Sequence, residues 1–349
     1  MWQSWWQAGR MLWNLCRAPA ETPTKGEFRT CELEAGEGRF SLDLYEPLSV
    51  YKGTLAVIHG MSPKGKADKR IQALCQALSG LGYRVVAPEI ESIRKLQICP
   101  SQIDKISHIL IGIANDRSMS PSGQIGVFAP SFSGGLCLAA ASQPSVRERI
   151  TAICTIGAFS EIESVMHYLL GNPLADSYGC FIALKKIVPL VCENPGYLQE
   201  VLDAAINDNL SPQPSQELAS RLLLMTKEQR HTSEKCLNDP AHRLTMFEQA
   251  RKHLTDEFRV FDVVSMVEPL SARVLLIHGK SDNVINPVES VQLYAVLKSI
   301  RKQAHLVITP FLTHGDSVFN LRAVSDVVKI MRGFAWFFEA FSETAQVRH

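Results

Sequence analysis

One stretch of the sequence has the residues for nucleophilic chemistry at the spacing of a strand-to-helix turn. An apolar run from Ile125 to Ala129 predicts a buried strand, and Gly134 and Gly135 open a helical pattern. Ser131 lies between them, with a small residue two positions away on either side. A sharp turn needs small neighbours because strand and helix backbones almost touch, and it lifts the hydroxyl to the top of the sheet. The helix start presents backbone N–H groups to a developing oxyanion.

This stretch resembles the nucleophile turn of the α/β-hydrolase superfamily, small-x-Ser-x-small, in which the small residues are most often glycines. The chain departs from the pattern by carrying Ala129 and Ser133 at these positions. A second register makes Ser133 the nucleophile. The resemblance favours Ser131, because the family places its nucleophile about two residues beyond the last apolar residue of the strand. A strand-glycine-helix turn without catalysis is the other interpretation.

Two later loops resemble the acid and histidine loops of the same superfamily. An apolar run from Val274 to Ile277 leads into a turn with Asp282, and one from Leu306 to Ile308 leads into a loop with His314. The chain order Ser131, Asp282, His314 is the order of the family, and each residue follows a predicted strand.

The three residue types suit acyl transfer. A serine hydroxyl is a poor nucleophile until a base removes its proton. His314 can accept and return that proton near neutral pH, and Asp282 would hold the required tautomer. Glu161 and Glu163, which follow a predicted strand ending near residue 156, are alternative acids.

A fourth segment, His59-Gly60-Met61, follows an apolar run and resembles the oxyanion loop of the superfamily. The resemblance implies that the backbone N–H groups of Met61 and Phe132 hold the oxyanion. His59 is a secondary candidate for the catalytic histidine, since in this motif the residue more often orients the loop. No cofactor or metal is implied.

Residues 60–66 also fit the phosphate-binding pattern G-x-x-x-x-G-K. The next residue is Ala67, which has no hydroxyl for Mg²⁺, and Asp68 would repel phosphate. We therefore disfavour a nucleotide-binding function. The local basic residues could attract an anionic group of a substrate or form a solvated helix start; they are Lys64, Lys66, Lys69 and Arg70.

Strand and helix patterns alternate along residues 27–160 and return from about residue 268, with only helical patterns between. Alternation of this kind predicts a mostly parallel sheet with helices on both faces. We expect an α/β-hydrolase fold with four segments: an N-terminal Trp-rich helix and linker (1–25), a core in two pieces (26–160 and 268–349), and a helical cap inserted after the sixth strand (161–267).

Composition narrows the function classes. With 36 Lys and Arg against 35 Asp and Glu, the net charge is +1, which provides no overall attraction for nucleic acid. The nine cysteines form no CxxC pair and several lie in apolar runs, which indicates buried thiols in a reducing, cytoplasmic environment. No apolar run is long enough to predict a transmembrane span.

The N-terminus holds four of the five tryptophans, Trp2, Trp5, Trp6 and Trp13. At helical spacing they share one face with Gly9, Leu12 and Cys16. We expect a helix whose aromatic face is incompletely covered, either resting peripherally on a membrane or packing on the protein itself.

Together these features predict a serine hydrolase acting on a small-molecule ester with an apolar acyl or aryl part. The alternatives are a thioesterase or acyltransferase with the same triad, and a non-catalytic ligand-binding protein on the same fold.

Overall fold

The computed structural model describes residues 2–17, 28–211, 216–312 and 324–346. They form two compact units. The first comprises described residues of the ranges 1–160, 261–282 and 287–349, and the second comprises those of 161–260 and 283–286.

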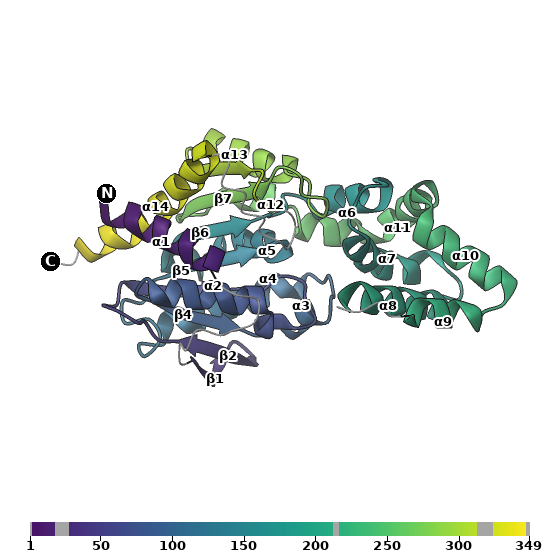
Figure 1. Ribbon diagram of the computed structural model, residues 1–349, viewed down its shortest axis with the longest axis horizontal. Coiled ribbons are helices and arrows are strands. Elements are labelled where there is room, and N and C mark those ends of the chain that lie inside the picture. Colours follow the sequence, from purple (N-terminus) through teal and green to yellow (C-terminus); the bar gives the residue numbers. More distant parts are fainter. Residues whose placement is uncertain (1, 18–27, 212–215, 313–323, 347–349) are drawn as a thin grey trace. The chain divides into compact units, whose positions relative to one another are not determined.

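An eight-stranded sheet forms the centre of the first unit (Figure 1). Its order is β1-β2-β4-β3-β5-β6-β7-β8, with antiparallel pairing from β1 to β2 and from β2 to β4 and parallel pairing elsewhere. The predicted mostly parallel sheet is therefore confirmed. The strands are β1 (Phe28–Ala35), β2 (Gly38–Tyr45), β3 (Gly53–Val57), β4 (Tyr83–Pro88), β5 (Ile125–Pro130), β6 (Ile150–Ile156), β7 (Arg273–Gly279) and β8 (Ala304–Thr309).

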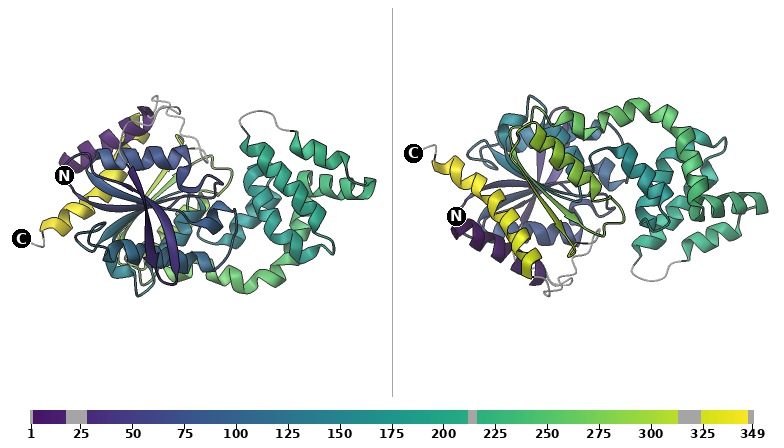
Figure 2. Two further views of the ribbon diagram at one scale, coloured as in Figure 1. Left: turned by 90° about the horizontal axis from the view of Figure 1, so that it is seen from below. Right: turned by 90° about the horizontal axis from the view of Figure 1, so that it is seen from above.

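Helices cover both faces of the sheet (Figure 2). On one face α2 contacts β4, α14 contacts β6, β7 and β8, and α1 packs on both helices. On the other face α4 and α5 contact β5, α13 contacts β7 and β8, and α12 joins α5 to α13. The bounds are α1 (Trp2–Arg17), α2 (Lys69–Gly80), α3 (Glu91–Arg94), α4 (Ser101–Asn115), α5 (Phe132–Ala141), α12 (Val263–Met266), α13 (Val288–Ser299) and α14 (Val324–Gln346).

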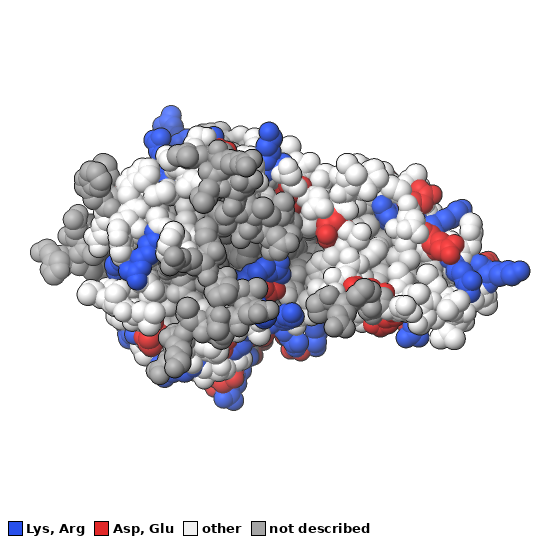
Figure 3. Space-filling model, viewed as in Figure 1, with Lys and Arg blue, Asp and Glu red and all other residues white. Residues whose placement is uncertain are grey.

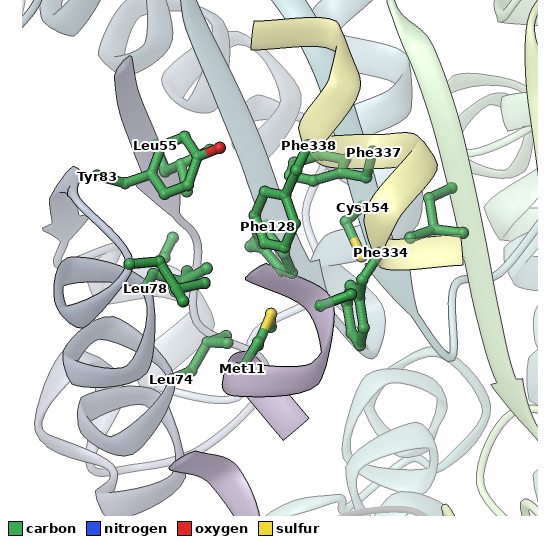
Figure 4. Packing of buried hydrophobic residues seen from close by; sticks show 14 of the residues in the cluster. Met11, Leu55, Leu74, Leu78, Tyr83, Phe128, Cys154, Phe334, Phe337 and Phe338 are labelled. Carbon is green, nitrogen blue, oxygen red and sulfur yellow. The ribbon is translucent and has the colours of Figure 1, made fainter. Parts of the chain in front are cut away.

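Aromatic packing fastens α14 to the centre of the sheet. Figure 4 shows Met11 of α1, Leu74 of α2 and Phe334 of α14 converging below the strands. The ring of Phe128 on β5 meets Phe337 edge-on, with 4.9 Å between centroids. Contacts of this kind add about 0.5–1.5 kcal/mol to the free energy of apolar burial. These contacts hold α14 against the sheet, whose strand ends carry the loops of the candidate site.

The second unit is helical. Its helices are α6 (Ile162–Gly171), α7 (Ser177–Val191), α8 (Gly196–Leu210), α9 (Glu217–Leu223), α10 (Lys227–Asn238) and α11 (Pro240–Val260). The inserted block begins after β6, but residues 261–267 belong with the sheet, because Val263 N–H donates to the carbonyl of Ser160 (2.9 Å). Residues 283–286 belong with the helices, where Asp176 N–H donates to the carbonyl of Asn283 (2.9 Å).

The surface carries both signs of charge. Figure 3 shows Lys and Arg interspersed with Asp and Glu over the described part of one face. Within the described residues, no helix has the length and apolar character needed to cross a bilayer. The thiols of Cys137 and Cys154 are fully buried, and burial raises the pKa of both.

Candidate active site

Ser131 stands in a strained turn at the end of β5. Its φ of 58° and ψ of −138° lie outside the regions that residues with a Cβ normally occupy. The N–H of Ser131 donates to the carbonyl of Ile156 on β6 (2.7 Å), and its own carbonyl accepts from Gly134 N–H (2.8 Å). α5 begins at the next residue, Phe132. Strain of about 1–3 kcal/mol persists only where the surroundings enforce it, and such positions cluster in functional sites.

Ser133 has a different environment from Ser131. It is fully buried, and its hydroxyl donates to the carbonyl of His59, the residue that follows β3 by two positions. Ser131 is partly exposed. The hydroxyl of Ser133 therefore joins the turn to the neighbouring loop, a role that glycine could not fill.

The glycines of the turn allow a close approach between α5 and the loop after β6. A Cβ on Gly134 would lie 2.8 Å from the Cβ of Ala158, and one on Gly135 would lie 2.5 Å from the ring of Phe159. The ring of Phe159 also stacks on Phe132, with centroids 5.4 Å apart. The helix start is thereby held against the sheet, with the Phe132 N–H in the first turn, where a helix offers its amides no internal acceptor.

The His59-Gly60-Met61 segment lies against the same turn. A Cβ on Gly60 would be 3.3 Å from the carbonyl oxygen of Pro130 and 3.4 Å from the Cβ of Ser131. Together with the Ser133–His59 hydrogen bond, this contact brings the segment predicted as the oxyanion loop beside Ser131.

His59 is held by its own loop and by the loop after β4. The ring is fully buried, with Nδ1 2.9 Å from the carbonyl oxygen of Gly60. Nε2 lies 3.0 Å from the N–H of Ile90 and 3.1 Å from a carboxylate oxygen of Glu89. Both ring nitrogens thus contact loop atoms. This geometry suits a residue that holds the loop rather than one that removes a proton from Ser131.

Asp68 anchors the far side of this loop. Its side chain caps the start of α2 through Arg70 N–H (3.0 Å) and accepts the hydroxyl of Ser62 (2.8 Å). Burial by itself raises the pKa of Asp68, but hydrogen bonds and the charge of Arg70, with the Ser62 hydroxyl, outweigh it and lower the pKa to about 2.

We expect Asp68→Ala to lower the free energy of unfolding by about 1–2 kcal/mol through loss of the cap. Because the folded pKa is depressed, the carboxylate's contribution is complete above the unfolded value of about 3.9 and fades as pH falls toward about 2. Urea unfolding at several pH values measures this contribution to the free energy of unfolding. Asp176→Ala, which removes the cap that accepts Gly179 N–H on α7, is the matched control. Only Asp68→Ala should also slow turnover, and equal turnover in the two variants would contradict a role in the loop.

The pattern at residues 60–66 does not form a phosphate cradle. Lys66, its lysine, extends to β2, where Nζ donates to Asp43 (2.6 Å) and Ser41 (3.1 Å) in a largely buried ion pair. Arg70 is likewise paired, with Asp68. Lys66 and Arg70 therefore have structural partners, which weakens the hypothesis that the cluster attracts an anionic substrate.

Asp282 follows β7 in a turn that is tied to β8. Its N–H donates to the carbonyl of Gly279 (3.2 Å), and Lys280 N–H donates to Thr309 (2.8 Å). A Cβ on Gly279 would lie 2.1 Å from the carbonyl oxygen of Leu312. Only glycine therefore allows the end of β7 to lie this close to the segment that follows β8. Asp282 is buried, with 6% of its surface exposed.

A buried histidine contacts Asp282 and links it to the loop after β6. Nε2 of His278 lies 3.6 Å from the Asp282 carboxylate, and Nδ1 lies 2.6 Å from the hydroxyl of Ser290 on α13. The Ser290 oxygen is also 3.5 Å from the carbonyl of Ala158.

Glu289, next to Ser290, is a buried carboxylate that the sequence interpretation missed. It accepts the N–H of Ser160 (2.9 Å) and the Ser160 hydroxyl. Glu289 thus fixes the loop on which Phe159 packs against α5. An acidic residue in the first turn of a helix is usually a solvent-exposed side chain that interacts with the helix dipole. No feature of the sequence therefore distinguished Glu289 as a buried carboxylate.

His314 lies outside the described residues, and the described chain stops two residues before it, at Leu312. Glu161, the alternative acid, begins the helical unit, where its carbonyl accepts from Val165 N–H (3.4 Å). Glu163 lies in α6 of the same unit. Among the described residues, no group of three or more His, Cys, Asp or Glu side chains is placed to hold a metal ion.

Solved structures share this architecture. The acylaminoacyl peptidase of Pyrococcus horikoshii aligns with a TM-score of 0.51 at 16% identity, over 91% of this chain and 42% of that one. A puromycin-hydrolyzing peptidase of Mycobacterium tuberculosis aligns at 0.51 and 11% identity (91% and 40%). Dipeptidyl peptidase 4 of Porphyromonas gingivalis aligns at 0.50 and 10% identity (87% and 35%).

The chain has the α/β-hydrolase fold. It spans between 35% and 42% of the length of the three peptidases, so the likeness concerns the fold and not their whole activity. Neither a protein-family model nor a curated protein matches the sequence. On the α/β-hydrolase fold, Ser131 occupies the strand-to-helix turn after β5, and Asp282 follows β7 at the same edge of the sheet.

Proposed function

We propose that the protein is a serine hydrolase that cleaves carboxylic esters through Ser131, His314 and Asp282. The observation that carries the proposal is the backbone of Ser131, which is strained at the end of a central parallel strand and leads directly into a helix. A structural turn gains nothing from such strain when glycine would avoid it.

In this mechanism the hydroxyl of Ser131 attacks the ester carbonyl while His314 takes its proton. The N–H groups of Met61 and Phe132 stabilise the oxyanion that forms. His314 returns the proton to the leaving alcohol, and water then releases the acid from the acyl-enzyme. Asp282 orients His314 and stabilises its protonated form, while His278, which contacts Ser290, lies 3.6 Å from the Asp282 carboxylate.

A fluorophosphonate probe tests the enzyme hypothesis. We expect stoichiometric labelling of the full chain and a labelled peptide containing Ser131, because the probe reacts with an activated serine and forms a stable adduct. Heat-unfolded protein is the control. Absence of labelling, with a folded protein verified by its circular dichroism, would favour a non-catalytic binding protein.

Peptide cleavage is a second candidate function, because the peptidases reported above share the fold. Matched acyl groups on p-nitrophenol and on p-nitroaniline separate esterase from amidase activity. A series of p-nitrophenyl esters of increasing chain length tests the apolar acyl preference, and acyl-thioesters with and without an alcohol acceptor test thioesterase and acyltransferase chemistry.

A further inference from the structure

Helix α1 buries one face and exposes another that carries two indoles. The buried face consists of Ser4, Gln7, Ala8, Met11 and Leu12. Trp6 and Trp13 are 55% and 56% exposed, and they recur at helical spacing with Gln3 and Arg10, which are also exposed. A helix that buries Gln7 and Ser4 while exposing two tryptophans reverses the usual arrangement of a packed surface helix.

Two cations converge on the indole of Trp6. The guanidinium of Arg10 lies 5.0 Å from the ring centroid, and Nζ of Lys52 lies 6.0 Å from it. Nζ of Lys52 also donates to the carbonyl of Leu81 (2.6 Å). Burial and the nearby charge of Arg10 lower the pKa of Lys52. Repulsion of this kind would be relieved by an anion in contact with both groups.

The two segments that carry these residues contain no acidic side chain. Residues 2–17 and 47–52 contain no Asp or Glu. Glu46, which precedes the second segment, is paired with Arg84. The loop that carries Lys52 also exposes two apolar side chains, Leu48 (64%) and Val50 (82%). The surface therefore combines indoles, exposed aliphatic groups and cations.

We infer that this surface, Trp6, Arg10, Trp13, Lys52, Leu48 and Val50, binds the headgroup region of an anionic lipid bilayer. Indole rings favour the membrane–water interface, where one side of the ring is apolar and the other is hydrated. Lys and Arg beside them attract anionic headgroups. A protein surface that packs on the two indoles would not need every charged group beside the rings to be positive, whereas an anionic bilayer favours this arrangement.

Lys52 of the proposed lipid surface and Ser131 lie at opposite ends of the central strands. Lys52 directly precedes β3 and its N–H donates to the carbonyl of Gly82, which directly precedes β4 (2.9 Å). Ser131 follows the carboxyl end of β5, which is parallel to β3. A lipid contact at Lys52 is therefore at the other end of the strands from Ser131, and it does not depend on the proposed hydrolase activity.

Co-sedimentation of the full chain with vesicles tests the inference. We expect binding to vesicles of phosphatidylcholine with a third phosphatidylglycerol, and much weaker binding to phosphatidylcholine alone. Arg10→Gln/Lys52→Gln should weaken binding to the anionic vesicles by about tenfold or more, whereas Lys227→Gln/Lys235→Gln, which removes two exposed cations from α10, should not. Trp6→Ala/Trp13→Ala should also reduce binding, and the control Leu223→Ala/Leu224→Ala should not.

Two further measurements make the result decisive. Brominated lipid should quench the tryptophan fluorescence of the unmodified protein and should quench Trp6→Ala/Trp13→Ala much less. Thermal unfolding verifies that each variant is folded. Absence of vesicle binding, or equal binding by all variants, would overturn the inference. Concentration-dependent dimers that are lost in the tryptophan variant, without vesicle binding, would assign the surface to a second copy of the chain instead.

Discussion

Ser131→Ala is expected to lower the turnover of a p-nitrophenyl ester by about four or more orders of magnitude while the protein stays folded. The substitution removes the nucleophile and with it the covalent route, so the residual rate reflects only oxyanion stabilisation and substrate binding. The backbone at Ser131 is strained with any side chain that has a Cβ, so alanine should fold in the same turn. Steady-state kinetics and fluorophosphonate labelling measure the loss.

Ser133→Ala is the matched control, since it removes a hydroxyl two residues away. It leaves the His59 carbonyl without its buried donor, which should cost about 1–3 kcal/mol of stability. Labelling at Ser131 should persist. Full activity in Ser131→Ala together with loss of labelling in Ser133→Ala would transfer the nucleophile role to Ser133.

Asp282→Asn is expected to produce the second large effect, a loss of about four orders of magnitude in kcat with little change in the fold. An amide has nearly the shape of the carboxylate but cannot stabilise the protonated histidine, and it favours the wrong tautomer. The pH dependence of kcat measures the change. The contact between Asp282 and His278 persists in shape, so unfolding by urea should shift only modestly.

Glu161→Gln is the control for Asp282→Asn, because Glu161 is the alternative acid. We expect its kcat to stay close to that of the unmodified enzyme. A large loss in Glu161→Gln with activity retained in Asp282→Asn would exchange the roles of the two carboxylates. Equal, moderate losses in both would show that neither orients the catalytic histidine.

The local strand and helix patterns and the mostly parallel type of the sheet were readable in the sequence because they depend on short-range physics. The apolar run from Ile125 and the glycines at 134 and 135 determine a strand-turn-helix, and the alternation around it determines a mostly parallel sheet. In a parallel sheet all carboxyl ends meet at one edge. For that reason Ser131 and Asp282, far apart in the chain, could be predicted to lie at the same edge.

The aromatic face of α1 is incompletely covered, as its composition predicted, but the spacing did not specify which residues are buried. Hydrophobic spacing places Trp6, Leu12 and Trp13 on one stripe, but the structure buries Met11 and Leu12 and exposes both indoles. α1 packs closely on α14, where a Cβ on Gly9 would lie 3.2 Å from the Cε of Met331.

The sequence by itself determined that a serine, an aspartate and a histidine each follow a predicted strand, and that a mostly parallel sheet brings Ser131 and Asp282 to one edge. Only the tertiary structure decided how the turn is held. The hydroxyl of Ser133 reaches His59, and Glu289 reaches Ser160 from a helix 129 residues later. A buried polar group must find a partner, but nothing in its local sequence specifies which one. The packing of distant elements makes that choice.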